Sequence, residues 1–302
     1  MYSPMSSDDV YQIHLATMEV LERVGVLVEN DAMLSLLEDA GAYVDEKGKK
    51  ARIPEYLIRE GAKRAPSSFV LYSRNGKKFR IGEEKTLVIP SANATWILDL
   101  ETSEPRPATR KDVEQTTRLS DALEHTDICS PSVLPQDVEP TMIDVYAAEA
   151  MMCNTSKPYF VAPCDDEQSS YVIEIAAIIA GGMTELEKNP ILIGFVSPTS
   201  PLRLAVKELE IARKFIEHQL PLFVAPCPNS GATSPISLAG TLVVMCAEYL
   251  ALTLIVQLLN PGNPVVVGGA PAIMDMKTVN ISYGSVETAL MGAATAQWVV
   301  FT

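Results

Sequence analysis

The sequence is poor in the residues on which several classes of protein depend. Its 302 residues include 3 histidines and 2 tryptophans, and 24 basic residues stand against 38 acidic ones for a formal net charge of −14. This shortage of lysine and arginine argues against nucleic acid or an anionic membrane as a partner, because both require a basic surface. A negative field would suit a cationic small molecule, although acidity in most proteins serves solubility.

Cysteine is also sparse and scattered. The sequence has no Cys-x-x-Cys pair and no histidine at metal-ligand spacing, and its cysteines are odd in number: Cys129, Cys153, Cys164, Cys227 and Cys246. Such a set is typical of a protein kept reduced in the cytosol and argues against a disulfide framework. We therefore expect a cytoplasmic protein.

Signals for export, membrane insertion and nucleotide binding are missing as well. The N-terminus, Met1-Tyr2-Ser3-Pro4, has no basic region, and the longest apolar stretch, residues 250–259, is interpreted as too short to span a bilayer. Neither a G-x-G-x-x-G fingerprint nor a P-loop occurs. With 47% apolar and 21% charged residues, the composition is that of a globular protein of one large domain or two modest ones.

The N-terminal part, residues 1–108, combines helix and strand patterns. Apolar residues recur at helical spacing over residues 7–24 and 31–40, and Pro54 is expected in the first turn of a third helix. Short apolar runs separated by glycine turns then predict strands over residues 69–72, 79–81, 86–89 and 95–98. We interpret this part as an α+β N-terminal region.

From residue 109 the pattern becomes a strand–helix alternation. Thr109 and Asp112 have the spacing of a capping box and predict a helix to residue 123. Five short apolar runs predict buried parallel strands, at residues 128–134, 159–164, 191–196, 222–226 and 265–268. Helical patterns lie between and after them, at residues 146–152, 169–180, 202–218, 238–259 and 285–300.

Two α/β architectures fit this alternation, an open doubly wound sheet and a TIM (β/α) barrel. The absence of a nucleotide fingerprint favours the barrel. A barrel needs about eight strands, and the sequence supplies five candidates before it ends. We therefore expect residues 109–302 to form a partial (β/α) barrel catalytic domain, incomplete at its C-terminal end.

In a barrel the active groups lie in the loops after the strands. The loops after the third, fourth and fifth predicted strands are rich in small residues with hydroxyl or amide groups, and two acidic residues follow the fifth. The candidate substrate-binding residues are therefore Ser197, Thr199, Ser200, Asn229, Ser230, Gly231, Thr233, Gly268, Asp275 and Glu287. The alternative is that these are ordinary turns and helix caps, because loops generally use such residues. Either acidic residue could balance a cationic substrate.

Other residues offer weaker chemistry. His14, His125 and His218 fall in helices or at a strand entrance, where surface or capping roles are expected. Cys164 and Cys227 each end an Ala-Pro-Cys stretch after a strand, which leaves a zinc-dependent barrel methyltransferase or decarboxylase as an alternative. Small buried apolar residues are the commoner role for such cysteines.

Several ordered motifs resemble the trimethylamine:corrinoid methyltransferases and their glycine betaine relatives. Short matches open the chain, at Val24-Gly25-Val26, Ala40-Gly41-Ala42 and Arg64-Ala65-Pro66. The most specific matches are Ser197-Pro198-Thr199-Ser200-Pro201-Leu202, Ser230-Gly231-Ala232-Thr233-Ser234-Pro235 and Pro261-Gly262-Asn263-Pro264. Together the motifs cover nearly the whole chain.

The resemblance implies a TIM-barrel enzyme that moves a methyl group from trimethylamine, or a related methylated amine, to the cobalt of a cognate corrinoid protein. In methanogens this reaction begins methane formation. The implied enzyme binds no cofactor directly, because the corrinoid belongs to the partner, and family barrels tend to form homo-oligomers. The family's pyrrolysine position lies beyond residue 302, so the catalytic residues stay unknown. A read-through amber codon, a fragment and a pseudogene are all compatible with this end, and an inactive fragment is a further alternative.

Overall fold

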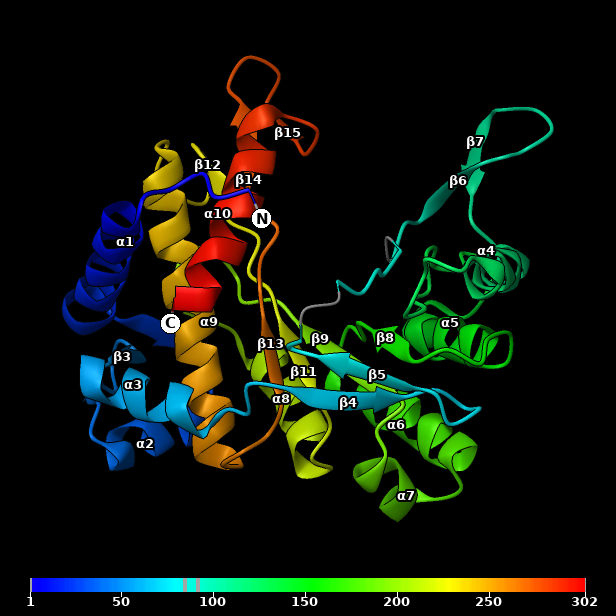
Figure 1. Ribbon diagram of the computed structural model, residues 1–302, viewed down its shortest axis with the longest axis horizontal. Helices are drawn as coiled ribbons and strands as arrows, with labels where there is room; N and C mark the ends of the chain where they lie inside the picture. Colours follow the sequence, from blue (N-terminus) through cyan, green and yellow to red (C-terminus); the bar gives the residue numbers. More distant parts are fainter. Residues whose placement is uncertain (1, 84–85, 91–92, 302) are drawn as a thin grey trace. The chain divides into compact units, whose positions relative to one another are not determined.

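In the computed structural model the chain has an α/β fold (Figure 1). The structure describes residues 2–83, 86–90 and 93–301. Two compact units share the chain: the first unit comprises residues 1–65, 196–209 and 223–302, and the second unit comprises residues 66–195 and 210–222. The chain passes between units after residue 65 and inside β9 (Leu192–Val196), α8 (Val206–Glu217) and β11 (Leu222–Val224). The boundaries of these two units differ from the boundary expected from the sequence at residue 108. The division into an N-terminal region and a catalytic domain at that residue stays a prediction.

Three helices open the first unit. Ser6 and Asp9 form a capping box at the start of α1 (Ser7–Glu19), and a π-helical turn continues it over Val20–Val24. The predicted helix over residues 31–40 is confirmed as α2 (Asp31–Ala40), which begins at the Asn30 cap and ends at the left-handed Gly41. Pro54 precedes α3 (Glu55–Arg64) as its N-cap rather than standing within its first turn.

A small sheet joins these helices, and sequence patterns did not reveal its strands. Its strand order is β10-β1-β3-β2, in which β3 (Lys50–Arg52) is antiparallel to both β1 (Val26–Val28) and β2 (Tyr43–Asp45). The fourth strand, β10 (Arg203–Leu204), pairs with β1 in parallel. The helix predicted over residues 202–218 was therefore wrong at its start: α8 (Val206–Glu217) begins only after this strand.

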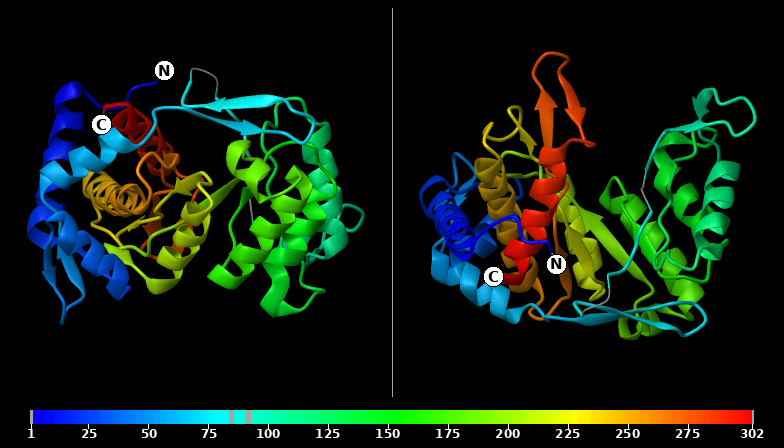
Figure 2. Two further views of the ribbon diagram at one scale, coloured as in Figure 1. Left: turned by 90° about the horizontal axis from the view of Figure 1, so that it is seen from below. Right: turned by 45° about the horizontal axis from the view of Figure 1, so that its top comes forward.

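The core of the first unit is α9 (Leu238–Leu259), whose predicted limits are confirmed. Helices α1, α2, α3 and α10 (Val286–Phe301) all contact it (Figure 2). At 22 residues it is long and apolar enough to cross a membrane, which corrects the expectation that no stretch is. However, 83% of its most apolar window is buried inside the protein, as in the core helix of a soluble domain.

The remaining strands of the first unit lie near the ends of β9 and β11. β13 (Val265–Val267) neighbours β11, and Gly268 N donates to Val224 O at 3.1 Å. Beyond β11, β12 (Asn229–Ser230) pairs in parallel with β14 (Ala272–Asp275), which forms a hairpin with β15 (Asn280–Ser282). These last three short strands were not predicted.

In the second unit, helices accompany a parallel strand pair. β8 (Tyr159–Val161) pairs with β9, with Phe160 opposite Ile193. The helices are α4 (Arg110–Ala122), α5 (Ile143–Met152), α6 (Asp166–Ala180) and α7 (Met183–Lys188). Two hairpins precede them: β4 (Phe69–Tyr72) with β5 (Lys78–Ile81), and β6 (Trp96–Leu98) with β7 (Pro105–Pro107).

Two predicted strands of the second unit were wrong. Residues 86–89 belong to no strand. Residues 128–134 form only isolated bridges, Cys129 with Tyr159 and Val133 with Ala94. Pro131 stands between these bridges and has no N–H to donate, so a continuous ladder cannot form across it.

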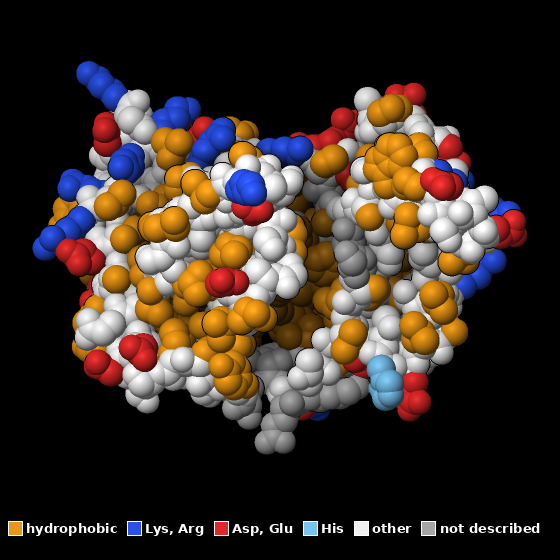
Figure 3. Space-filling model, turned by 90° about the horizontal axis from the view of Figure 1, so that it is seen from above, with side chains coloured by type: hydrophobic (Ala, Val, Ile, Leu, Met, Phe, Trp, Pro, Cys, Tyr) orange, Lys and Arg blue, Asp and Glu red, His pale blue; other side chains and the backbone are white. Residues whose placement is uncertain are grey.

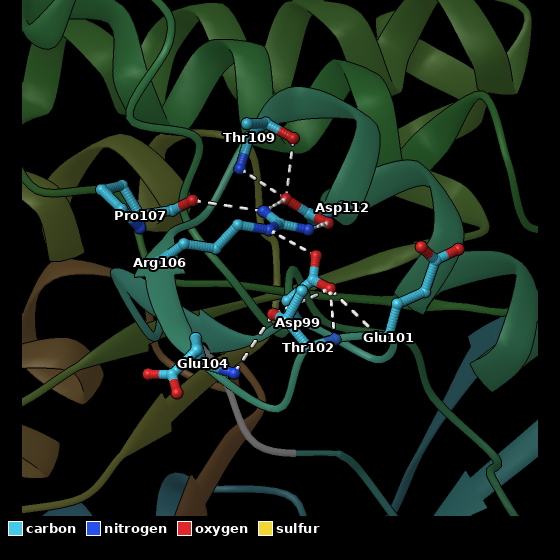
Figure 4. Close-up of polar contacts among 8 residues, drawn as sticks. All are labelled: Asp99, Glu101, Thr102, Glu104, Arg106, Pro107, Thr109 and Asp112. Carbon is cyan, nitrogen blue, oxygen red and sulfur yellow. Dashed lines mark hydrogen bonds and ion pairs between the residues drawn. The ribbon is translucent and has the colours of Figure 1, made fainter.

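Arg106 joins the β6–β7 hairpin to α4 (Figure 4). Its guanidinium donates to both carboxylate oxygens of Asp112, at 2.7 and 2.8 Å, and to Asp99 Oδ2 at 3.0 Å. Asp112 also completes the predicted capping box with Thr109. The arginine holds the pKa of Asp112 well below its usual range, with the Thr109 hydrogen bonds acting in the same direction.

Candidate substrate site

The candidate site lies in the first unit, where the ends of β9, β11 and β13 come together. Ala225 N donates to Val196 O at 3.1 Å, and Gly268 N donates to Val224 O at the same distance. Ala270 N continues the second ladder by donating to Pro226 O at 3.1 Å. The three loops with predicted site residues therefore start from neighbouring strand ends at one edge.

Cys227 is the residue around which these loops meet. The Ser197 hydroxyl lies 3.9 Å from the Cys227 sulfur. Burial raises the pKa of the Cys227 thiol, whereas hydrogen bonds with Ser197 and with the backbone of Ala270 lower it, and the nearby charge of Glu248 raises it. The thiol is therefore held neutral at the junction of the loops that follow β9, β11 and β13.

Two carboxylates hold the loop after β9. Thr199 Oγ1 donates to Glu208 Oε1 at 2.6 Å, and the adjacent Ser200 Oγ donates to Glu248 Oε2 at 2.8 Å. Leu202 N donates to the other Glu248 oxygen, also at 2.8 Å. The hydroxyls of Thr199 and Ser200 are thus used to shape the loop.

Glu248 was not among the residues predicted from the sequence. It is fully buried in α9, and burial raises its pKa to about 7, although the hydrogen bonds from Leu202 and Ser200 oppose that rise. It is also the single Asp, Glu, Lys or Arg in the 22 residues of α9. The sequence did contain a signal for Glu248, because it is a lone acidic residue inside the apolar helix predicted over residues 238–259.

The loop after β11 is closed by its own side chains. Thr233 Oγ1 accepts from Asn229 N at 2.9 Å. The hydroxyls of Ser230 and Ser234 lie 2.6 and 2.8 Å from Thr241 Oγ1 on α9. Gly231 adopts a φ of +83°, which glycine reaches without strain. Ser230 and Thr233 therefore fix the backbone here.

Among the predicted site residues, Asn229 has a side-chain oxygen that accepts no hydrogen bond from the described residues. Its Nδ2 donates weakly to Cys227 O at 3.4 Å. Its Oδ1 is buried and has no hydrogen-bond partner among the residues that the structure describes. A buried amide oxygen without a partner costs free energy, so it is suited to receive an N–H donor from a ligand.

The two acidic residues predicted for the site make no hydrogen bond to the loops that meet at Cys227, among the residues that the structure describes. Asp275 is exposed at the turn of the β14–β15 hairpin and accepts from Lys277 N and Thr278 Oγ1, at 2.9 and 2.8 Å. Glu287 is exposed in the first turn of α10. Both positions are typical of local capping, so substrate binding by Asp275 and Glu287 stays a prediction, as it does for the other eight residues.

The predicted surface or capping roles suit His125, which is exposed, but not His14, which is half-buried against Trp298. The ring centroids of His14 and Trp298 lie 6.0 Å apart with the ring planes tilted by 35°. His218 Nδ1 lies 3.2 Å from Glu187 Oε1. For the zinc alternative, Cys164 instead donates to Asp144 through both its backbone N–H and its thiol. Across residues 2–83, 86–90 and 93–301, no group of three or more His, Cys, Asp and Glu could hold a metal ion.

Two exposed apolar side chains lie beside Gly231, which directly follows β12. Ile236 and Met276 expose 74% and 64% of their areas, and both approach Gly231, whose added Cβ would lie 3.2 Å from the Met276 sulfur. Figure 3, which looks from the side where the β14–β15 hairpin stands in Figure 1, shows many apolar side chains with scattered charges among them. The surface next to the candidate site is therefore partly apolar, with the exposed charges of Asp275 and Lys277 on either side of Met276.

An α/β protein whose strand ends carry small polar loops of this kind is typical of an enzyme. A family model described as trimethylamine methyltransferase (MTTB) matches residues 1–301. The chain belongs to the trimethylamine methyltransferase family.

Curated relatives agree with this assignment. The chain is 36% identical over 293 residues to a trimethylamine methyltransferase of Desulfitobacterium hafniense (strain DSM 10664 / DCB-2), covering 97% of this chain and 59% of the relative. It is 30% identical to a glycine betaine methyltransferase of D. hafniense (strain Y51), covering 98% and 62%. A trimethylamine methyltransferase of Methanosarcina thermophila is 32% identical, again covering 98% and 62%. The chain thus spans about three-fifths of the length of these relatives.

The fold is shared with a solved structure of low sequence similarity. The monomethylamine methyltransferase MtmB of Methanosarcina barkeri superposes with a TM-score of 0.59 at 15% identity, covering 98% of this chain and 66% of that chain. A hydroxylamine complex of MtmB gives a TM-score of 0.58, also at 15% identity. At this identity the likeness confirms the α/β fold alone.

Proposed function

We propose that this chain carries part of the active site of a methyltransferase that takes a methyl group from trimethylamine, or a related methylated amine, and delivers it to the corrinoid of a separate cognate protein. The proposal rests on the family assignment over residues 1–301 together with one structural observation. That observation is the meeting of three strand-end loops at Cys227, near a fully buried carboxyl group, that of Glu248. Trimethylamine is the member of the substrate class that most of the matched relatives' names favour.

The electrostatics of the junction suit a methylated ammonium ion. Cys227 stays neutral, and in the described part of the chain Glu248 has no cationic partner within salt-bridge distance. An ionised Glu248 therefore leaves negative charge beside the loops, which attracts a cation in a medium of low dielectric. Asn229 Oδ1 adds an acceptor for an N–H of a protonated amine.

In this arrangement the protein acts by positioning. The corrinoid of the partner supplies the nucleophile that accepts the methyl group. The chain binds the amine, orients one N–CH₃ bond outward and shields the nitrogen, which leaves as a neutral amine when the bond breaks. Holding the reactants in this geometry removes much of the entropic barrier to a reaction between two molecules.

The surface around the loops is compatible with a planar macrocycle. Gly231, Gly268 and Ala270 carry at most a methyl side chain, and the neighbouring Ile236 and Met276 are exposed and apolar. A flat, largely apolar corrin can pack against these small and apolar groups, with the charges of Asp275 and Lys277 at the hairpin turn beside it. We also propose a (β/α) barrel, a homo-oligomer and a cytoplasmic location, supported by the family and by five free cysteines.

A methyl-transfer assay tests the proposed function. The chain is incubated with cob(I)alamin and trimethylamine, dimethylamine, glycine betaine or choline, and the absorbance change on methylation is followed. Calorimetry measures binding of the same amines to the chain alone. We expect binding and transfer with trimethylamine above the other amines. A chain that neither binds any of these amines nor transfers a methyl group would refute the proposal.

A further inference from the structure

We propose that Glu248 is a positioning residue that holds the loop of residues 197–202 in place for the amine. Deletion of its two acceptor oxygens should release that loop and weaken amine binding. The second half of this inference rests on the proposed function, because it takes the loop as part of the amine site. The first half concerns the loop alone and can be tested without any substrate.

The position of Glu248 is costly for the fold. Its side chain has no exposed area, and the rest of α9 carries no other Asp, Glu, Lys or Arg. Burying a carboxylate without a cation is unfavourable, and an apolar residue of similar volume at such a position is often neutral or stabilising. Global stability therefore does not account for this acid.

Both hydrogen bonds of Glu248 go to the loop after β9. They come from the Ser200 hydroxyl and the Leu202 N–H, which lie 48 and 46 residues away in sequence. One carboxylate thus grips a short loop at two points. Above its pKa of about 7 the Glu248 carboxyl is ionised, and each bond to the charged acceptor is then stronger than a neutral one.

Within the loop of residues 197–202, the backbone of Leu202 adopts a conformation that contacts from outside the loop must hold. Leu202 adopts a φ of +55°, a left-handed conformation that a branched apolar side chain rarely takes. On its other side, Leu202 O accepts from Leu27 N on β1 at 2.8 Å. Leu202 is therefore clamped between β1 and α9, and removal of either clamp favours relaxation of its backbone.

A change in the backbone conformation of Leu202 would also displace residues of the candidate site, because they belong to the same loop. Thr199 and Arg203 exchange two backbone hydrogen bonds, of 3.0 and 3.1 Å, across the turn that contains Ser200 and Leu202. Ser197 begins the same loop and contacts Cys227, the junction of the three loops. A loop freed at Leu202 would no longer hold Ser197 in a single position.

Two variants separate positioning from charge and from general stability. Glu248→Met removes both acceptors at similar volume, whereas Glu248→Gln keeps one acceptor oxygen and can accept from Leu202. The matched control is Gln257→Met: Gln257 is also fully buried on α9, but its amide binds Gly262 N and Asn263 O in a different loop. Circular dichroism and urea unfolding establish that each variant is folded.

Amide hydrogen exchange at Leu202 is the primary measurement. We expect exchange in Glu248→Met at least about tenfold faster than in the unmodified chain, the ratio that corresponds to the loss of one hydrogen bond to a charged group. Glu248→Gln should restore most of the protection, and Gln257→Met should leave Leu202 unchanged. Unchanged protection in Glu248→Met, or equal acceleration in the Gln257→Met control, would overturn the proposal.

Amine binding supplies the second measurement. The Kd for trimethylamine should rise about tenfold in Glu248→Met, less in Glu248→Gln and not in Gln257→Met. If Glu248→Met frees the loop but binds the amine as the unmodified chain does, Glu248 does not position the amine site. If the unmodified chain binds no methylated amine, the proposed function fails, and the exchange data still decide whether Glu248 holds the loop.

Discussion

At the scale of single residues, the polar groups of this chain serve backbone geometry before they serve a ligand. Thr199, Ser200, Ser230 and Thr233 all use their hydroxyls within or beneath the loops that contain them. Their side chains therefore make the loops rigid. What is left for a ligand is the Asn229 amide oxygen and the charge of Glu248.

The raised pKa of Glu248 predicts a specific dependence of stability on pH. The folded pKa is about 7, against 4.5 for the free group, so between these values the folded state binds more protons than the unfolded state. Stability should therefore fall as pH rises from about 4.5 to about 7 and then level off, by a contribution of about 3 kcal/mol. Urea unfolding at pH 5 and pH 8 measures this difference.

The Glu248→Gln variant is the control for this prediction. Its free energy of unfolding should vary less between the two pH values than that of the unmodified chain, because glutamine does not titrate. Equal variation in both proteins would show that Glu248 does not titrate in this range.

Replacement of Arg106 should lower the stability of the folded chain. Replacement by methionine removes the two-pronged ion pair with the buried Asp112 and the contact with Asp99. Because 38% of the arginine side chain is exposed, solvent screens part of the interaction. We expect Arg106→Met to lower the free energy of unfolding by more than the loss of an exposed ion pair does, measured by urea unfolding at pH 7.

An ion pair within a single helix calibrates this expectation, because its acidic partners are more exposed than Asp112. Arg213 pairs with Glu210 and Glu217 on its own helix, and Arg213→Met should cost less than about 1 kcal/mol. A similar loss for both variants would mean that the Arg106 network adds nothing beyond an ordinary surface pair. The lowered pKa of Asp112 further implies that this stabilisation persists above pH 4 and declines as acid protonates the carboxyl.

At the scale of elements, close approaches decide where the packing tolerates change. Gly194 in β9 has no room for a side chain, because an added Cβ would lie 2.5 Å from the Phe215 ring on α8. Gly292 in α10 has open space at the same position. The same substitution should therefore have opposite effects in the two elements.

Alanine at each glycine tests this contrast. Gly194→Ala overpacks a buried contact and should destabilise the chain by about 1–3 kcal/mol. Gly292→Ala removes the backbone entropy penalty of glycine in a helix and should stabilise it by about 0.5–1 kcal/mol. Thermal unfolding of both variants gives the sign, and stabilisation by Gly194→Ala would contradict so close an approach of the Phe215 ring to β9.

At the scale of the whole molecule, β13 is an edge. Within the described residues it neighbours β11 on one side and no strand on the other, and its three valines are half-buried. An unpaired edge with apolar side chains is a template for another strand. We therefore expect the 302-residue chain to self-associate through β13.

Sedimentation at rising protein concentration tests this expectation. Val266→Lys places a charge on the edge and should suppress association, whereas Val206→Lys, at an exposed position on α8, should not. A chain that stays monomeric at about 100 µM, or equal suppression by both lysines, would rule out β13 as the contact.

Sequence patterns located most elements whose signals are local. The limits of α2 and α9 were predicted to the residue, because Asn30 and Gly41 bound α2 and Ser237 caps α9. Strands of two or three residues escaped, since a pairing such as Leu27 with Arg203 joins residues 176 apart and leaves no periodic trace. The apolar run around Pro131 was wrongly predicted to be a strand, because an apolar sequence alone does not ensure continuous hydrogen bonding to a neighbouring strand.

The amino-acid sequence by itself determined the helix–strand alternation, the family and the loops in which a site was sought, because caps, apolar runs and ordered motifs are properties of neighbouring residues. Only the tertiary structure decided which side chains in those loops are already engaged and that Glu248 supports them from α9. Hydrogen bonds between residues nearly fifty positions apart depend on how the helices and strands pack, and local patterns contain no record of that packing.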